Sequence, residues 1–199
     1  VYKRQDHQIF ASSVREELAF GPRNIGLSEA AVAERVEESL HRFGLHEEAD
    51  MPPALHDFAW RRKVAIASVY AMRPKTLLLD EPTGGLDWET VHDLMALLSD
   101  LHAEGHSIVV ITHDMTLVAQ YAQRVLVMDK GVLVADQTPS DLLSNPDAAM
   151  VSDILPPVAR LTRTLFDYTV PAGAVTVSDF VRDYAAFAVS RKAHSGGVE

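Results

Sequence analysis

Two adjacent carboxylates follow a short apolar run, and no other pair of residues in the sequence is better placed for chemistry. Leu77, Leu78 and Leu79 are followed directly by Asp80 and Glu81. A buried apolar run predicts a strand, and ligands of open α/β sheets bind outside the carboxyl ends of the strands. Asp80 could hold Mg²⁺ there, directly or through water, and Glu81 could polarise a water that attacks a γ-phosphate. The alternative is an exposed acidic turn.

A histidine follows a second apolar run. Residues 107–112 are Ser-Ile-Val-Val-Ile-Thr, a β-branched run that predicts a buried strand, and His113 comes next. If the two strands are parallel, they end at the same edge of the sheet, where His113 could contact a γ-phosphate and orient the attacking water. The remaining histidines are interpreted as surface or core residues. A metal pair at His102 and His106 is not expected, because Gly105 ends the helix between them.

The elements that must position these residues alternate along the chain. Apolar periodicity, caps and breakers predict helices at 28–43, 60–72, 88–103, 114–122, 157–166 and 177–188, and strands at 76–80, 107–112, 125–128 and 132–135. A helix that begins near Thr138-Pro139 is also expected. Helices that alternate with strands at this spacing indicate an α/β fold with a parallel sheet.

Composition excludes several classes of function. The 199 residues carry 18 Lys and Arg against 28 Asp and Glu, a net charge of −10, which argues against nucleic acid as a partner. The sequence has no cysteine, so thiolate metal sites, disulfides and a cysteine nucleophile are excluded. No apolar run reaches the roughly 18 residues of a membrane span, and no secretory signal is visible. We therefore expect a cytoplasmic protein.

Several runs together resemble the second half of an ABC-transporter ATP-binding subunit, most closely those of energy-coupling-factor and cobalt-type importers. The runs that carry the resemblance are 62–67, 79–83, 85–87 and 112–114, with weaker similarity at 6–10, 14–17, 19–27 and 155–161. The resemblance implies a partial P-loop NTPase fold, a RecA-like parallel sheet with a helical subdomain and a small C-terminal helical appendage. It places the ATP-binding domain at 6–150, the helical subdomain at about 12–72, the core at about 76–136 and a C-terminal extension at 151–199.

The resemblance also implies a mechanism. Two such subunits form a head-to-tail dimer around two ATP molecules, and closure drives transmembrane partners. Asp80 then serves Mg²⁺, Glu81 is the catalytic base, His113 contacts the γ-phosphate and Asp87 lies across the dimer. Residues 8–21 would face the transmembrane subunits. This places the protein peripherally at the cytoplasmic face of the membrane, with vitamins or cobalt and nickel ions as cargo.

The phosphate-cradling loop of this family is missing from the sequence. That loop needs Gly-x4-Gly-Lys-Ser/Thr, and the decoy from Gly21 to Ser28 has Leu27 where the lysine is required. We therefore expect an amino-terminally truncated copy that lacks Walker A, and we interpret residues 1–5 as a non-native scar. Loss of the amino-terminal strands would expose one face of the core sheet, so we predict that the isolated chain is poorly stable or aggregates.

The family's signature motif, Leu-Ser-Gly-Gly-Gln, also differs. By ungapped alignment it becomes His56, Asp57, Phe58, Ala59 and Trp60. In the family this motif meets the γ-phosphate that the other subunit holds. A carboxylate at 57 repels a phosphate, and an aromatic ring at 58 replaces a glycine that permits close approach. The signature is therefore predicted to be degenerate, which favours a heterodimer with one good and one weak site. Asp57 could also cap a helix.

Three functions remain open. The first is an ATP-hydrolysing subunit of a membrane importer. The second is a catalytically degenerate partner subunit or a non-functional fragment, which the missing cradle and the residues at 57 and 58 support. The third is a soluble ABC-type ATPase of translation or DNA repair, which is disfavoured because such proteins usually carry tandem domains, long insertions or basic arms.

Overall fold

The structure is a computed structural model that describes residues 9–144, 155–165, 174 and 176–195. The chain divides into two compact units, Val1–Ile111 and Thr112–Glu199. Residues 1–5, interpreted above as a scar, lie outside the described residues, as does Gln8.

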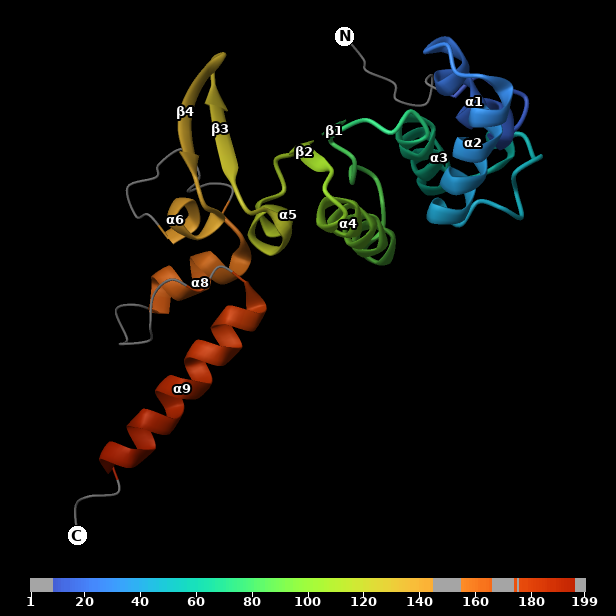
Figure 1. The fold of residues 1–199 in the computed structure, drawn as a ribbon. Coiled ribbons are helices and arrows are strands. Elements are labelled where there is room, and N and C mark those ends of the chain that lie inside the picture. Colours follow the sequence, from blue (N-terminus) through green and yellow to red (C-terminus); the bar gives the residue numbers. More distant parts are fainter. Residues whose placement is uncertain (1–8, 145–154, 166–173, 175, 196–199) are drawn as a thin grey trace. The chain divides into compact units, whose positions relative to one another are not determined.

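Three helices pack on one another in the first unit (Figure 1). They are α1 (Val14–Asn24), α2 (Glu29–Phe43) and α3 (Phe58–Tyr70), with a short 3-10 helix, η2 (Pro53–Leu55), before α3. Each α-helix begins with a side-chain cap, because the oxygens of Ser13, Ser28 and Asp57 accept backbone N–H groups of the first turn. Their shared core consists of fully buried Val14, Leu18, Val36, Leu40, Leu45 and Val64.

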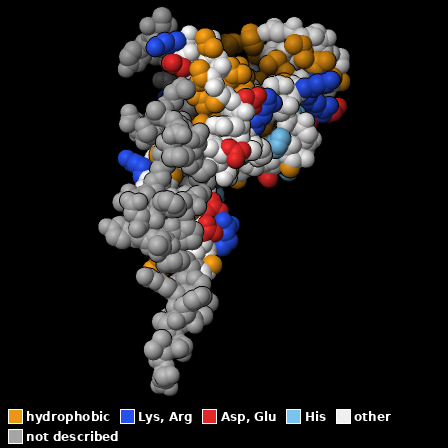
Figure 2. All heavy atoms as spheres, turned by 90° about the vertical axis from the view of Figure 1, so that its left-hand side faces the viewer, with side chains coloured by type: hydrophobic (Ala, Val, Ile, Leu, Met, Phe, Trp, Pro, Cys, Tyr) orange, Lys and Arg blue, Asp and Glu red, His pale blue; other side chains and the backbone are white. Residues whose placement is uncertain are grey.

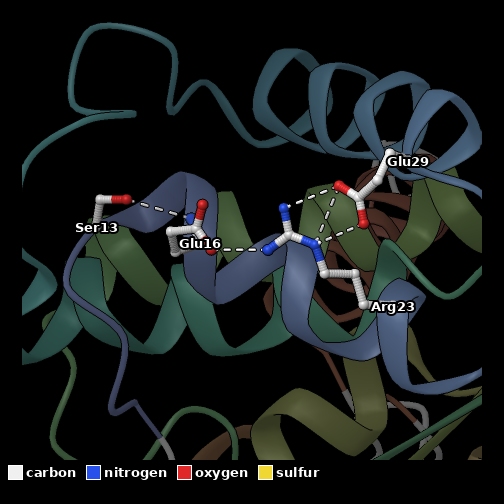
Figure 3. Close-up of polar contacts among 4 residues, drawn as sticks. All are labelled: Ser13, Glu16, Arg23 and Glu29. Carbon is white, nitrogen blue, oxygen red and sulfur yellow. Dashed lines mark hydrogen bonds and ion pairs between the residues drawn. The ribbon is translucent and has the colours of Figure 1, made fainter.

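Polar contacts connect α1 with the start of α2 (Figure 3). The Ser13 hydroxyl accepts the Glu16 N–H at 3.2 Å. The Arg23 guanidinium donates to the Glu16 carboxylate at 2.8 Å and to the Glu29 carboxylate at 3.1 Å. All three charged side chains are largely exposed, so the network contributes little to stability and mainly fixes the direction of the chain between the helices.

The first unit also holds a pair of parallel strands, β1 (Thr76–Asp80) and β2 (Ser107–Ile111), joined by α4 (Trp88–Ala103). Leu77 is buried, and α4 contacts β2. The opposite face is bare: Leu78 is 67% exposed, and Val109, its partner across the pair, is 43% exposed. Strand periodicity puts Asp80 and Ile111 on this same bare face.

The described residues of the second unit form a helix, a hairpin and three further helices. In chain order these are α5 (Met115–Tyr121), β3 (Val125–Asp129), β4 (Val132–Gln137), α6 (Pro139–Ser144), α8 (Pro157–Leu165) and α9 (Val177–Ser195). Lys130 and Gly131 turn the hairpin with φ of 48° and 81°, the left-handed pair that suits the twist of antiparallel strands. Met115, Val118, Leu142, Leu143, Leu155 and Ala159 form the core of this unit.

The sequence-based expectations for the elements are largely confirmed. The parallel pair is present, and the helix expected at 88–103 has those bounds. The helix expected at 60–72 begins two residues earlier, at Phe58, because Asp57 caps it. The sequence pattern does not delimit helix α1, since Gly21 and Pro22 normally break helices and here lie inside one.

Apolar side chains remain exposed in both units, and Figure 2 shows hydrophobic side chains (orange) on the viewed face. Those of the hairpin are Leu126, Met128, Val132, Leu133 and Val134. Within the described part of the chain, no helix combines the length and the apolar character that crossing a membrane requires.

Candidate functional site

Glu81 is fixed in an uncommon backbone conformation directly after β1. Its φ is +47°, in the left-handed region that few residues other than glycine adopt. Its N–H donates to the Ile111 carbonyl, the last of β2, at 2.8 Å. Asp80, half-buried, is the register partner of Ile111. The structure therefore sets the two predicted acids at the carboxyl end of the parallel pair.

The acids lead into a tight turn that ends at α4. The Gly84 N–H donates to the Glu81 carbonyl at 3.3 Å, and the Leu86 N–H donates to the Thr83 carbonyl at 3.2 Å. Gly85 has a φ of +79°, which a residue with a Cβ adopts only at a cost. The turn depends on this glycine for its shape.

Asp87 closes the turn as the cap of α4. Its carboxylate accepts the Thr90 N–H at 3.0 Å and the Thr90 hydroxyl at 2.9 Å. These hydrogen bonds favour the charged form and lower the pKa of Asp87 below its ordinary value. The next residue, Trp88, is 80% exposed, and its ring stacks on His92 at 5.5 Å between ring centroids. The end of the turn therefore presents a carboxylate beside an exposed aromatic ring.

His113 belongs to the second unit, where it is exposed two residues after the end of β2. The Thr112 hydroxyl accepts the Asp114 N–H at 3.0 Å. The Asp114 carboxylate in turn caps α5 by accepting the Thr116 and Leu117 N–H groups at 2.8 and 3.3 Å. Hydrogen bonds between near neighbours in the sequence thus fix the backbone around His113. The approach of His113 to Glu81 stays a prediction.

Of the five residues aligned with the signature, the last four, residues 57–60, lie at the start of α3. The Asp57 carboxylate accepts the Trp60 N–H at 2.8 Å, so Asp57 is the helix cap, as considered above. The Trp60 ring stacks on His56 with 3.6 Å between centroids. A Cβ added at position 85 would lie 3.5 Å from the Phe58 ring, so this signature position lies beside the acidic turn. Ala59, half-buried, completes the first turn.

A cavity of about 360 Å³ lies beside α1, in the stretch expected to face transmembrane subunits. Its lining includes Phe10 and Phe20, exposed rings that pack edge to face at 4.7 Å between centroids. The sequence pattern did not indicate the residue that holds the backbone at one side of this cavity. Glu17 is buried on α1, and its carboxylate accepts the Phe10 and Ala11 N–H groups at 3.1 and 3.0 Å. The available signal was a charge at the apolar spacing of Val14 and Leu18.

The donor set at Asp80 suits a hard cation that a nucleotide brings with it. The described residues contain no cluster of three or more His, Cys, Asp or Glu side chains able to hold a metal. Mg²⁺ at nucleotide sites is typically held by one or two carboxylates together with phosphate oxygens and water. A single half-buried carboxylate at a strand end fits that requirement.

Comparison with known proteins gives the family. The energy-coupling factor transporter ATP-binding protein EcfA of Methanococcus maripaludis is 32% identical over 192 residues, which cover 92% of this chain and 69% of that protein. The chain belongs to this family. The EcfA proteins of Methanoculleus marisnigri and Methanocaldococcus jannaschii are 41% and 39% identical, each over 83% of this chain. No protein-family model matches the chain.

The chain spans about 60% of the length of these two EcfA proteins. Among solved structures, cbiO1 of Clostridium perfringens, part of the ABC transporter complex cbiONQ, has a TM-score of 0.66 at 35% identity. The match covers 79% of this chain and 64% of cbiO1. An ATP-binding subunit of an ABC transporter gives a TM-score of 0.57 at 26% identity, covering 67% of this chain and 57% of that one. The P-loop NTPase fold class inferred from the sequence is thereby confirmed.

Proposed function

We propose that the chain supplies the catalytic half of an ATP-hydrolysing subunit that powers a membrane importer. The observation that carries the proposal is the placement of Glu81. Its left-handed backbone and the hydrogen bond that its N–H donates to the Ile111 carbonyl fix it at the carboxyl end of the parallel pair. Ligands of open α/β sheets bind at that edge. The relatives are energy-coupling factor transporter ATP-binding proteins, which supports ATP as the nucleotide, and the place of Glu81 supports its hydrolysis.

Each candidate residue has a role in this proposal. Asp80 would hold Mg²⁺, which neutralises phosphate charge when it is bound. Glu81 would accept a proton from the water that attacks the γ-phosphate, and His113 would donate a hydrogen bond to that phosphate. Asp87 would face a second ATP-binding subunit. In this assignment Glu81 acts as a general base, a role that typically contributes 10²- to 10⁴-fold in rate.

A heterodimer is the favoured assembly. Asp57 already fills the start of α3 with its own carboxylate, which accepts the Trp60 N–H. A phosphate held by a second subunit would meet a negative charge there, together with the ring of Phe58. Two copies of this chain would both carry this defect, whereas a different partner would supply one intact signature.

The cavity beside α1 supports docking to transmembrane subunits. It offers two exposed aromatic rings, Phe10 and Phe20, beside the ion-paired Arg23. Aromatic anchors with a polar rim are typical of protein interfaces. On this proposal the protein lies peripherally at the cytoplasmic face of a membrane, and the cargo is a vitamin or a cobalt or nickel ion. Nucleic acid is not a proposed partner.

The chain spans only part of the length of its relatives, so the catalytic assignment is tested in a chimera. The amino-terminal part of the Methanoculleus marisnigri protein is joined to this chain, and phosphate release from ATP is measured. Glu81→Gln should lower the rate about 100-fold or more and leave ATP binding unchanged. The control is Glu89→Gln, which removes an exposed carboxylate in the first turn of α4. Equal rates in the two variants would refute the role of Glu81.

A second candidate, the catalytically degenerate partner subunit, is favoured by the cap at Asp57. It predicts that two copies of the chimera, which both carry Asp57 in the signature, bind ATP but hydrolyse none. Hydrolysis that is lost in Glu81→Gln would exclude it.

A further inference from the structure

The ring of Phe58, from another part of the first unit, lies beside the acidic turn. A Cβ added at position 85 would lie 3.5 Å from Cε1 and 3.9 Å from Cδ1 of the ring, so the ring stands where a side chain on Gly85 would touch it. The guanidinium of Arg62, one turn further along α3, lies over the same ring at 5.0 Å from its centroid. The ring is half-buried. Phe58 therefore packs on the turn while a side chain of its own helix holds it.

The turn is anchored at both ends, by Glu81 and Asp87, and the hydrogen bonds between these ends are longer. Both Glu81 and Gly85 have positive φ, and the hydrogen bonds inside the turn, to the carbonyls of Glu81 and Thr83, measure 3.3 and 3.2 Å. Such long hydrogen bonds stabilise a conformation only slightly. Gly84 and Gly85 are exposed, and glycine leaves the backbone free to adopt other conformations. A packed ring on one side of the turn reduces that freedom.

We propose that Phe58 is a positioning residue, whose ring holds the 81–87 turn and with it Glu81 and Asp87 in the shape described above. The ring that prevents a phosphate of the other subunit from approaching the signature closely would thus help to position the acids of its own chain. The contribution to catalysis rests on the proposed ATP hydrolysis. The contribution to the turn does not, because it requires no nucleotide.

Backbone hydrogen exchange of the whole chain, followed by mass spectrometry, tests the contribution to the turn. In Phe58→Ala, the peptide that contains the Gly84 and Leu86 amides should exchange about tenfold faster, while peptides of α1 and α2 stay unchanged. Phe58→Tyr keeps the ring and should restore protection. Leu55→Ala is the control. Leu55 precedes α3 and is 71% exposed, and none of its atoms is among those nearest to a Cβ added at position 85.

Unchanged exchange in Phe58→Ala would overturn the proposal. Faster exchange in Phe58→Ala that is spread evenly over the first unit would show general destabilisation, and the milder change Phe58→Leu then decides. If the turn peptide of Phe58→Leu is as protected as in the wild type, the proposal is overturned. Loss of protection in Phe58→Leu at the turn alone would support it.

The contribution to the reaction is tested in the chimera described above. Phe58→Ala should lower kcat several-fold with the KM for ATP unchanged, because the turn carries the base and not the nucleotide-binding surface. A raised KM at constant kcat would overturn this role. If the chimera hydrolyses no ATP, the proposed function fails, and the exchange experiment still decides whether Phe58 holds the turn.

Discussion

Asp87 shows how one residue can serve both the fold and the proposed function. Its carboxylate caps α4 through two hydrogen bonds from Thr90, and these lower its pKa. Asp87→Ala should therefore lower the denaturant midpoint of the first unit, and Asp87→Asn should lower it less, since asparagine also caps helices. Asp93→Ala, an exposed carboxylate further along the same helix, should leave the midpoint unchanged.

The pH dependence of this cap follows from the direction of the pKa shift. Because the folded pKa of Asp87 is lowered, its ionised form stabilises the fold fully above the ordinary aspartate value of about 4. That stabilisation is lost as pH falls through the lowered folded pKa. The difference in midpoint between the wild type and Asp87→Asn should therefore shrink between pH 5 and pH 3 in urea unfolding. A difference that is constant over this range would contradict the cap as an ionised acceptor.

Helices α2 and α3 are tied together by one buried hydroxyl. Ser39 is fully buried, and its hydroxyl donates to the Ala67 carbonyl at 2.8 Å. Ser39→Ala should lower the free energy of unfolding by about 1 kcal/mol, because the carbonyl keeps its helical bond from the Ala71 N–H. Ser68→Ala is the matched control, since that hydroxyl bonds the Ala65 carbonyl of its own helix. Urea unfolding that gives both variants the same midpoint would contradict this account.

Elements set by local signals could be predicted from the sequence, and contacts between distant residues could not. The bounds of α4 follow from its cap at Asp87 and the breaker at Gly105, and the acids after β1 follow from the apolar run before them. The packing of Phe58 on Gly85 has no local signal, because it depends on how α3 lies against the turn. The hydrogen bonds that the Glu17 carboxylate accepts from the Phe10 and Ala11 N–H groups likewise depend on tertiary packing.

At the scale of the whole molecule, the exposed apolar surface accounts for the expected behaviour of the chain alone. Parallel sheets in α/β proteins are normally covered on both faces. Here the face that carries Leu78, Val109 and Ile111 is bare, and the chain spans about 60% of the length of two of its EcfA relatives. We infer that further chain covers this face in the longer proteins. Without it, the bare face favours association between copies.

Two neighbouring leucines of β1 separate association from stability. Leu78→Thr changes a side chain that is 67% exposed and should reduce concentration-dependent association in analytical ultracentrifugation, with little change in thermal midpoint. Leu77→Thr changes a side chain that is 1% exposed and should lower the free energy of unfolding by about 3 kcal/mol. The two changes are chemically identical and lie on opposite faces of one strand, so only burial distinguishes them. A monomeric wild-type chain with a cooperative thermal transition would show that the bare face needs no cover.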